Sequence, residues 1–360
     1  MSVHTWVTAR IPAGVVHLDV AGCGRISQAA LDAQVAHLHL EAEVGGYEAE
    51  TSAASVVDGG RAALGAMAGL GGGDVAFSES AAVSFATLID AWPLDPGSRI
   101  GTVPGEYGGN ARVLRDRAHR RGWRLVILPV DEFGRVTDVP ADLDLVTFPQ
   151  VASQRGVDQP VADVLGALGT GAPLLLDVAQ SMGQCEVPAG CAAYVGTSRK
   201  WLCGPRGVGF AVITPEWEPR LADPPTLVPA YTSGARRFDT PEAHVAGRVG
   251  LAHAARAWSP ALLPVTAAAG AAARVLLEGA GGWSVREPVD APTGITTLRH
   301  PTADAFATRA ALLEWGVLVG AVPVVRADDV DVPLLRVSTA AWVTPGHLET
   351  LATALVTCSR

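Results

Sequence analysis

Short apolar runs alternate with amphipathic segments through the first two thirds of the chain. The apolar runs are nearly continuous, which is typical of strands covered on both faces. They span residues 74–78, 99–103, 124–130, 144–149, 173–178, 192–197 and 208–213. Between them, residues 80–92 and 110–122 have the spacing of amphipathic helices. This alternation predicts an α/β fold with a mainly parallel seven-stranded sheet and helices on both sides.

The pattern changes after about residue 245. Residues 245–258 and 265–282 predict long helices. A thinner pattern follows, with strands predicted at 294–300 and 334–340 and helices at 302–316 and 345–357. We therefore predict a large domain over residues 15–245 and a smaller C-terminal α+β domain over residues 246–360, with residues 1–14 packing on the smaller domain.

Composition and charge exclude several classes of function. The chain has 360 residues and a net charge of −9, without a basic stripe, which argues against binding to nucleic acid. Its longest apolar segment, residues 261–277, is interrupted by Pro264, Thr266 and Arg274, so we expect no membrane span. The N-terminus lacks the charged-then-apolar pattern of a signal peptide, and a cytoplasmic location is expected.

The five cysteines form no CxxC pair, and no histidine lies at metal-ligand spacing from them. The sequence therefore predicts no metal site, and it predicts buried, reduced thiols.

Lys200 is the only lysine in the chain. It follows a predicted buried strand and precedes the glycine-rich turn GPRGVG, where backbone can approach a ligand closely. A lysine in such a pocket loses solvent, its pKa falls, and its free amine can form a Schiff base. The turn fails the dinucleotide fingerprint, because no strand–GxGxxG–helix arrangement surrounds it.

Two further segments, each at a predicted strand end, could bind a charged group of a ligand. Asp177 ends the apolar run LLLD, where a pyridinium nitrogen could supply its cationic partner, although it could also cap the following helix. Near Ser80 a strand ends and a helix begins, and free backbone amides there suit a phosphate. Ser80 as an ordinary helix cap is equally consistent. The order phosphate site, carboxylate and lysine makes pyridoxal 5′-phosphate (PLP) the best single ligand.

These segments resemble the class V aminotransferase, or cysteine-desulfurase-like, branch of fold-type I PLP enzymes. LLLDVAQSMGQ (174–184) is similar to the family's DxxQSxGQ motif, and TSRKWLCGPRGVGF (197–210) to its Schiff-base segment. The resemblance implies a large PLP-binding domain and a catalytic Lys200 in a Schiff base with the cofactor. It also implies that Asp177 meets the ring nitrogen and Gln180 the phenolic oxygen.

Other segments extend the resemblance along nearly the whole chain. FSESAAVSF (77–85) stands at the family's phosphate turn and GEYGGN (105–110) at its EHHAN motif, while QVASQRGVDQPV (150–161) is similar to HVNNETGVVQPV. These segments imply that Tyr107 stacks over the cofactor ring as a catalytic residue. The further cofactor contacts that they imply are Ser80, Ala81, Ala82, Tyr107 and Ser153.

The substrate is implied to bind through two segments. VHLDVAGCGRIS (16–27) resembles the family's LDNAATTP segment, and LLRVSTAAWVT (334–344) resembles VRISPHVYNT. Ala21 and Gly22 would then contact substrate, and Arg336 would hold its α-carboxylate.

Three departures from the family pattern matter. Arg199 replaces a histidine that often precedes the lysine, and we expect its guanidinium on the cofactor phosphate, with Thr197 supplying the nearby hydroxyl. The family's Gly-Thr phosphate contact from a neighbouring subunit is not preserved in residues 236–247. Residues 318–336 contain no cysteine, so the persulfide chemistry of desulfurases is not expected.

Within this family the chain most resembles the hercynylcysteine sulfoxide lyases of ergothioneine biosynthesis in actinobacteria. That resemblance implies a small-molecule cysteine sulfoxide conjugate as substrate, cleaved by β-elimination, and a homodimer by family analogy. Alternatives are an isopenicillin-N-epimerase-like epimerase, an aminotransferase, or a cofactor-binding scaffold without activity. Tyr47, Glu48 and Trp342 are candidates for a quaternary ammonium group, although each is expected to be an ordinary packing or surface residue.

Overall fold

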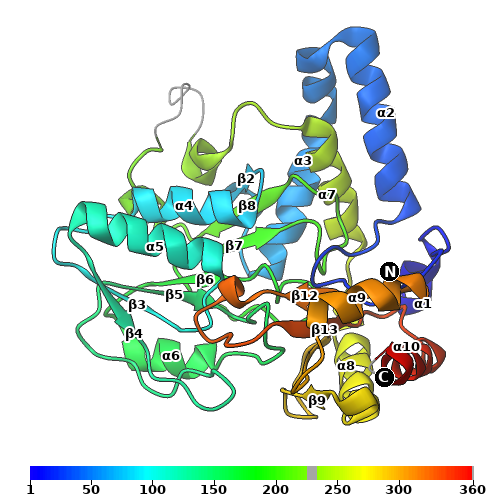
Figure 1. Cartoon of the computed structure of the whole chain (residues 1–360). Coiled ribbons are helices and arrows are strands. Elements are labelled where there is room, and N and C mark those ends of the chain that lie inside the picture. The colour runs from blue at the N-terminus through cyan, green and yellow to red at the C-terminus, as the bar shows by residue number, and fades with distance from the viewer. Residues whose placement is uncertain (225–232, 359–360) are drawn as a thin grey trace.

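A seven-stranded sheet forms the centre of the molecule (Figure 1). The structure is a computed structural model that describes residues 1–224 and 233–358. All seven strands predicted from the apolar runs are present, so that prediction is confirmed. In sheet order they are β2 (Val75–Ser78), β8 (Gly209–Ile213), β7 (Ala193–Thr197), β6 (Leu174–Asp177), β5 (Leu145–Pro149), β3 (Arg99–Thr102) and β4 (Arg124–Ile127).

The sheet is parallel except for β8, which is antiparallel to both of its neighbours. The connection from β7 to β8 is short, and a parallel neighbour would need a longer crossover. Helices α4 (Ala81–Ala91), α5 (Gly108–Arg121) and α6 (Val161–Leu168) provide crossovers elsewhere in the sheet. The carboxyl ends of β2, β5, β6 and β7 therefore lie at one edge, where open α/β sheets bind ligands.

Two apolar layers cover the two faces of this sheet, because successive strand residues point to opposite sides. In β6, Leu175 belongs to the layer that contains α4 and α5. Leu174 and Leu176 belong to the opposite layer, with α6, α3 (Gly46–Met67) and α7 (Val245–Ala257). The nearly continuous apolar character of the strand follows from this burial on both faces.

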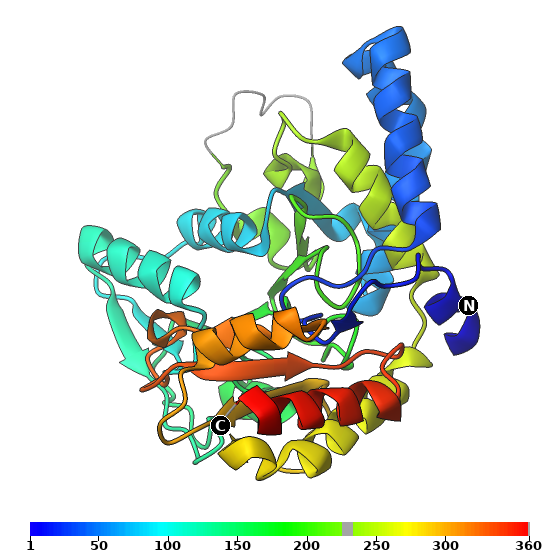
Figure 2. The ribbon, with the colours of Figure 1, turned by 45° about the vertical axis from the view of Figure 1, so that its right-hand side comes forward.

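α2 (Gln28–Val44) and α3 form a long helical hairpin that projects from the body of the molecule (Figures 1 and 2). Gly45 joins them with a φ of +87°, which glycine adopts without strain. The apolar pattern predicts no element before residue 74. The apolar residues Val35, Leu38 and Val44 of α2 are exposed, so the helix lacks the single apolar face that reveals a helix in a sequence.

The C-terminal part has its own antiparallel sheet and its own core. The sheet order is β12 (Gly320–Val322), β13 (Leu334–Ser338), β10 (Ile295–Arg299) and β9 (Ser284–Val285). Three helices contribute to this core: α8 (Leu262–Leu277), α9 (Ala305–Glu314) and α10 (Pro345–Cys358). The α+β character predicted for this region is confirmed, while the short strands β9 and β12 were not predicted.

α7 falls at the predicted start of the smaller domain, but it packs against α2 and α3. Its residues Val249 and Leu251 belong to the apolar layer under the large sheet. The domain boundaries themselves stay a prediction.

The N-terminal segment lies against the C-terminal part. In α1 (Val3–Thr8), the ring of Trp6 stacks on Trp342 with centroids 5.5 Å apart. β1 (Val16–His17) pairs in parallel with β11 (Val317–Leu318), and the chain then leads to Ala21 and Gly22. This path brings the N-terminal segment to the edge of the large sheet.

Across residues 1–224 and 233–358, no single helix is long and apolar enough to cross a membrane. α7 and α8 meet that criterion only as a pair, and they are bent by 88° relative to each other.

All five cysteines are free thiols. Cys185, Cys191 and Cys203 are buried as predicted. The prediction is wrong for Cys23 and Cys358, which are half-buried because they lie in a loop near the surface and at the end of the last helix.

Candidate active site

A cavity of about 430 Å³ lies at the carboxyl edge of the large sheet. All thirteen site residues predicted from the sequence line it: Ala21, Gly22, Ser80, Ala81, Ala82, Tyr107, Ser153, Asp177, Gln180, Thr197, Arg199, Lys200 and Arg336. Eight further residues that the sequence does not indicate also line it: Glu79, Asn110, Pro149, Val151, Ala179, Arg206, Gly207 and Arg326. The structure thus gathers residues from both the large sheet and the C-terminal part around one space.

Lys200 sits in a tight turn directly after β7. The amide of Cys203 donates to the Lys200 carbonyl at 2.9 Å, and Cys203 has a φ of +55°, which is uncommon outside glycine. Loss of solvent lowers the pKa of Lys200 to about 7, with Asp177 opposing the shift and Arg199 and Arg336 adding to it. Much of the free amine is therefore neutral near pH 7 and able to act as a nucleophile or a base.

Asp177 ends β6 and is buried. Its Oδ1 accepts from the Ala179 amide at 2.8 Å, and its Oδ2 accepts from Asn110 Nδ2 at 2.9 Å. Burial raises the pKa of Asp177, while the charge of Lys200 and these two donors oppose the shift. A buried carboxylate with a raised pKa is stabilised by a cation placed against it.

Glu106 lies behind Asp177 and was missed from the sequence. Asn110 Nδ2 also donates to Glu106 Oε1 at 3.1 Å, so one amide bridges the two carboxyl groups. Glu106 is 1 % exposed, and its Oε2 has no hydrogen-bond partner within the described residues. Burial, and then the nearby Asp177, raise the pKa of Glu106 to about 8. The four-residue spacing of Glu106 and Asn110 is the signal that could have linked them.

The N-terminus of α4 forms one end of the cavity. Ser80 caps this helix, with its side chain accepting from the Val83 amide at 3.3 Å, and Ala81 and Ala82 begin the first turn. Arg206 and Thr197 line the same cavity. Free amides, a helix dipole and a guanidinium together suit a phosphate.

Arg199 makes a contact that the sequence did not predict: its guanidinium donates to the Gly22 carbonyl. It thereby ties the lysine turn to the N-terminal segment while lining the cavity. Gly24 assists this approach, because a Cβ at this position would lie 2.5 Å from the Lys200 carbonyl oxygen. The predicted contact of Arg199 with a phosphate stays a prediction.

Arg336 lines the cavity from β13. Its guanidinium pairs with Asp19 Oδ1 at 3.0 Å and donates to the Ser153 carbonyl at 3.1 Å. Its buried Nε has no hydrogen-bond partner within the described residues. The Ser153 hydroxyl itself donates to Gln154 Oε1 at 3.2 Å.

Gln180 joins three segments at the floor of the cavity. Its Nε2 donates to the Ala21 carbonyl at 3.1 Å, and its Oε1 accepts from Trp201 Nε1 at 2.9 Å. Both ends of the amide are thus engaged and its orientation is fixed. A side-chain nitrogen of known direction suits a contact with an oxygen of a bound ring.

The residues present fit PLP. A buried carboxylate without a firm cationic partner matches a protonated ring nitrogen, and an amine with a lowered pKa matches an aldehyde. A helix N-terminus beside guanidinium groups matches a phosphate, and the half-exposed Tyr107 ring can lie against an aromatic face. We call the part around Asp177, Lys200 and α4 the cofactor end, and the part around Arg336 and Arg326 the substrate end.

The three residues considered for a quaternary ammonium group do not line this cavity. Tyr47 is 84 % exposed and Glu48 is also exposed, at the tip of the α2–α3 hairpin. Trp342 is buried against Trp6. Their interpretation as ordinary surface and packing residues fits these positions.

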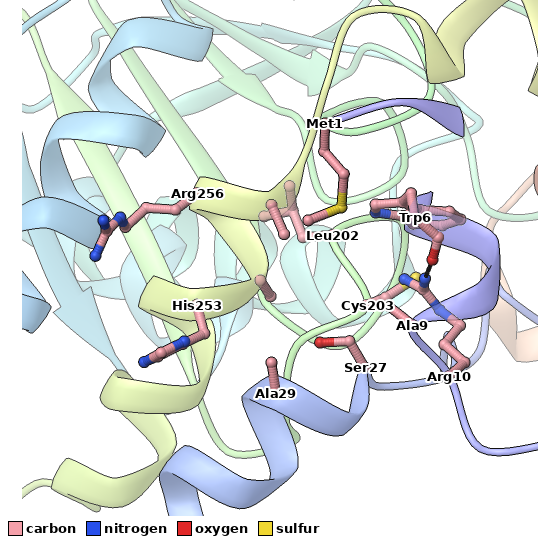
Figure 3. A pocket seen from close by; sticks show the side chains of 12 residues that line it. Met1, Trp6, Ala9, Arg10, Ser27, Ala29, Leu202, Cys203, His253 and Arg256 are labelled. Atoms are coloured by element: carbon pink, nitrogen blue, oxygen red, sulfur yellow. Dashed lines mark hydrogen bonds between the residues drawn. The ribbon is translucent and has the colours of Figure 1, made fainter. Parts of the chain in front are cut away.

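A second cavity, of about 310 Å³, lies under the N-terminal helix (Figure 3). Arg10 stacks over Trp6 there and donates to the Trp6 carbonyl, and Cys203 lies beside it (Figure 3). None of the predicted site residues lines this cavity. The predicted chemistry therefore belongs to the cavity at the carboxyl edge of the large sheet.

Comparisons with known proteins show the family to which this chain is similar. Residues 16–256 match the model of the family "Aminotransferase class-V". The chain is 38 % identical over 372 aligned positions to a Mycobacterium tuberculosis (strain CDC 1551 / Oshkosh) protein named "Probable hercynylcysteine sulfoxide lyase", covering 98 % of this chain and 92 % of the relative.

Solved structures confirm the predicted fold. The apo cysteine desulfurase from Thermococcus onnurineus NA1 superposes with a TM-score of 0.86 at 17 % identity, covering 99 % of this chain and 98 % of that one. The cystine C–S lyase C-DES in complex with its product cysteine persulfide gives a TM-score of 0.83 at 16 % identity, covering 96 % and 98 %. The chain therefore has the fold-type I architecture of PLP enzymes.

Proposed function

Because the chain belongs to the class V aminotransferase family, we propose that it is a lyase that cleaves hercynylcysteine sulfoxide in ergothioneine biosynthesis. Its cofactor is PLP, and its reaction class is that of a PLP-dependent carbon–sulfur lyase. The cavity supports the reaction class, because an amine, a buried carboxylate and a guanidinium (Lys200, Asp177 and Arg336) line one space. The relative's name, matched over nearly all of both chains, supports the substrate.

The chain's own residues divide the work at the two ends. Bound PLP supplies an electron-withdrawing ring that accepts the electron pair left when a proton leaves the substrate α-carbon. Asp177 would keep a negative charge at the ring nitrogen, and the N-terminus of α4 with Arg199 and Arg206 would hold the phosphate. Arg336 binds the substrate α-carboxylate and so fixes the direction of the Cα–H bond.

Lys200 acts as the general base. Its amine takes the α-proton, which its pKa of about 7 allows near neutral pH. The substrate then loses its bond between Cβ and sulfur, and the sulfur leaves with its oxygen as a sulfenic acid. The remaining three-carbon fragment takes up water and yields pyruvate and ammonia. The sulfenic acid of ergothioneine leaves the site, and an external two-electron reductant such as a thiol would then reduce it.

Desulfurase chemistry is disfavoured for this chain. It would need a nucleophilic cysteine near the substrate sulfur, and residues 318–336 contain none. No cysteine lines the cavity within the part of the chain that the structure describes. The sulfur of the substrate therefore leaves with its own substituent.

The test is to incubate the holoenzyme with S-substituted cysteine sulfoxides, hercynylcysteine sulfoxide included, and to measure pyruvate. Stoichiometric pyruvate and ammonia would support the lyase. Racemised substrate without pyruvate would identify an epimerase, and amino-group transfer to a 2-oxo acid would identify an aminotransferase. The same sulfoxides with Lys200→Ala serve as the control, and full activity of that variant would overturn the whole assignment.

The homodimer and the cytoplasmic location are part of the same proposal. Family analogy supports the first. Sedimentation of the purified protein and fractionation of cells test them separately.

A further inference from the structure

Arg326 is a cation of the substrate end that no sequence motif indicated. It ends the short helix η6 (Val324–Arg326), between β12 and β13, and it lines the cavity. Its guanidinium lies over the ring of Tyr107, 5.5 Å from the centroid. Its Nε is buried and has no hydrogen-bond partner within the described residues.

The other guanidinium groups of the cavity are better satisfied. Arg336 has Asp19 and a backbone carbonyl, Arg199 has a backbone carbonyl, and Arg206 is exposed to solvent. Across residues 1–224 and 233–358, no carboxylate forms an ion pair with Arg326. A half-buried guanidinium without an ion pair has lost hydration that its contact with the Tyr107 ring and the charge of Asp19 replace only in part.

The acidic residues that follow Arg326 cannot serve it, because each is engaged elsewhere. Asp328 pairs with Arg115 of α5, Asp329 with Arg155 at 3.3 Å, and Asp331 with Arg299 at 3.0 Å. These three ion pairs anchor the segment against different parts of the molecule. They leave the guanidinium of Arg326 directed at the cavity.

The topology places Arg326 with the substrate end. The helix η6 lies between β12 and β13, these two strands pair with each other, and β13 carries Arg336. Burial lowers the pKa of Arg326, and the charge of Arg336 adds to this shift while that of Asp19 opposes it. The anion that Arg326 lacks is therefore expected near the group bound by Arg336.

We propose that Arg326 binds a second anionic group of the substrate, a carboxylate on the substituent attached to sulfur. The substrate class is then an acidic cysteine S-oxide conjugate, with its α-carboxylate on Arg336 and its distal carboxylate on Arg326. This rests on the proposed function and sharpens it. The hercynyl group, a trimethylated histidine, has such a carboxylate.

The test uses two probes that differ only in charge: the S-oxides of S-(2-carboxyethyl)cysteine and of its amide, S-(2-carbamoylethyl)cysteine. The wild-type holoenzyme should show a KM about 10- to 100-fold lower for the acid, as a charge-assisted pair implies. Arg326→Gln should raise the KM for the acid to that of the amide and leave the amide and both kcat values nearly unchanged. Arg326→Lys should restore part of the preference.

Three outcomes would overturn the proposal. An equal loss on both probes would mean that Arg326 shares the α-carboxylate or only supports Tyr107. An unchanged preference would mean that Arg326 does not contact substrate. A weaker affinity of Arg326→Gln for PLP, titrated by absorbance, would assign the guanidinium to the phosphate. Arg120→Gln, at an exposed arginine of α5, is the matched control.

Failure of the proposed function is measured separately. If the wild type releases no pyruvate from either S-oxide or from hercynylcysteine sulfoxide, the lyase is wrong. The dissociation constants of the two thioethers, which need no cleavage, then still decide whether Arg326 recognises the distal carboxylate.

Discussion

The two ends of the cavity compensate their charges differently. At the cofactor end, Asp177 and Glu106 share Asn110, and the charges of Asp177 and Lys200 stabilise each other. At the substrate end, Arg336 is only partly paired and Arg326 has no ion pair within the described residues. A site that holds a resident cofactor can be neutral overall, whereas a site that selects an anionic substrate must keep cations available. The difference indicates that the balanced charges of the cofactor end serve the reaction, whereas the unpaired cations of the substrate end bind the substrate.

The largest effect is expected at Lys200. Lys200→Ala removes the general base and the amine that meets the cofactor, so pyruvate release should fall by roughly 10²- to 10⁴-fold. Lys200→Arg keeps the positive charge but cannot give up its proton, so it should be as inactive. Activity in the arginine variant would show that this end needs only a cation and would break the comparison. Initial rates on a cysteine sulfoxide measure both variants.

Asp177→Asn should have the next largest effect. The substitution keeps the shape and one of the two hydrogen bonds, from Ala179 or from Asn110, but removes the negative charge that the ring nitrogen needs. We expect kcat to fall by roughly 100-fold, the scale seen for loss of one preorganised electrostatic partner. Absorbance of the bound cofactor reports its state independently of turnover. Wild-type turnover in Asp177→Asn would mean that the cofactor end does not depend on this charge.

The substrate end should respond in KM instead. Arg336→Gln is expected to raise KM for every cysteine sulfoxide by roughly 10- to 100-fold, because it removes a charge-assisted contact with the α-carboxylate. Asp19→Asn should give a smaller increase, since Asp19 only orients the guanidinium. Gly22→Ala should resemble Asp19→Asn, because a Cβ there would lie 2.3 Å from Asp19 Oδ2. A change confined to kcat in these variants would contradict their place at the substrate end.

The same contrast explains what the sequence could predict. Asp177 and Lys200 follow continuous apolar strands, so a local pattern marks both of them and the sheet edge on which they meet. Arg326 reaches the cavity only because its segment is anchored to α5 and other distant elements, for example by Asp328 and Arg115. The pattern of apolar and polar residues within one segment does not show its contacts with distant segments. α2 was missed for a related reason, since α7 holds it in place rather than a single apolar face of its own.

Glu106 should give the smallest effect, and it tests the second layer of the cofactor end. Its pKa of about 8 means that the folded protein keeps a proton that the unfolded chain releases near pH 4.5. The stabilisation from this proton is complete below about pH 4.5, and it falls as pH rises until it is lost above about pH 8. Glu106→Gln is neutral at every pH, and it should match the wild type in turnover at pH 7.

The readout is the free energy of unfolding of the cofactor-free protein, from urea titrations at several pH values. The difference between wild type and Glu106→Gln should move in favour of the variant as pH rises toward 8, and then level off above that value. Glu106→Ala is the comparison variant, because it loses the acceptor for Asn110 and should cost stability at all pH values. A difference that does not vary with pH would mean that Glu106 is ionised throughout. The cofactor end would then hold two buried anions. The two ends of the cavity would differ in the sign of their net charge, and not in how far their buried charges are balanced by neighbours.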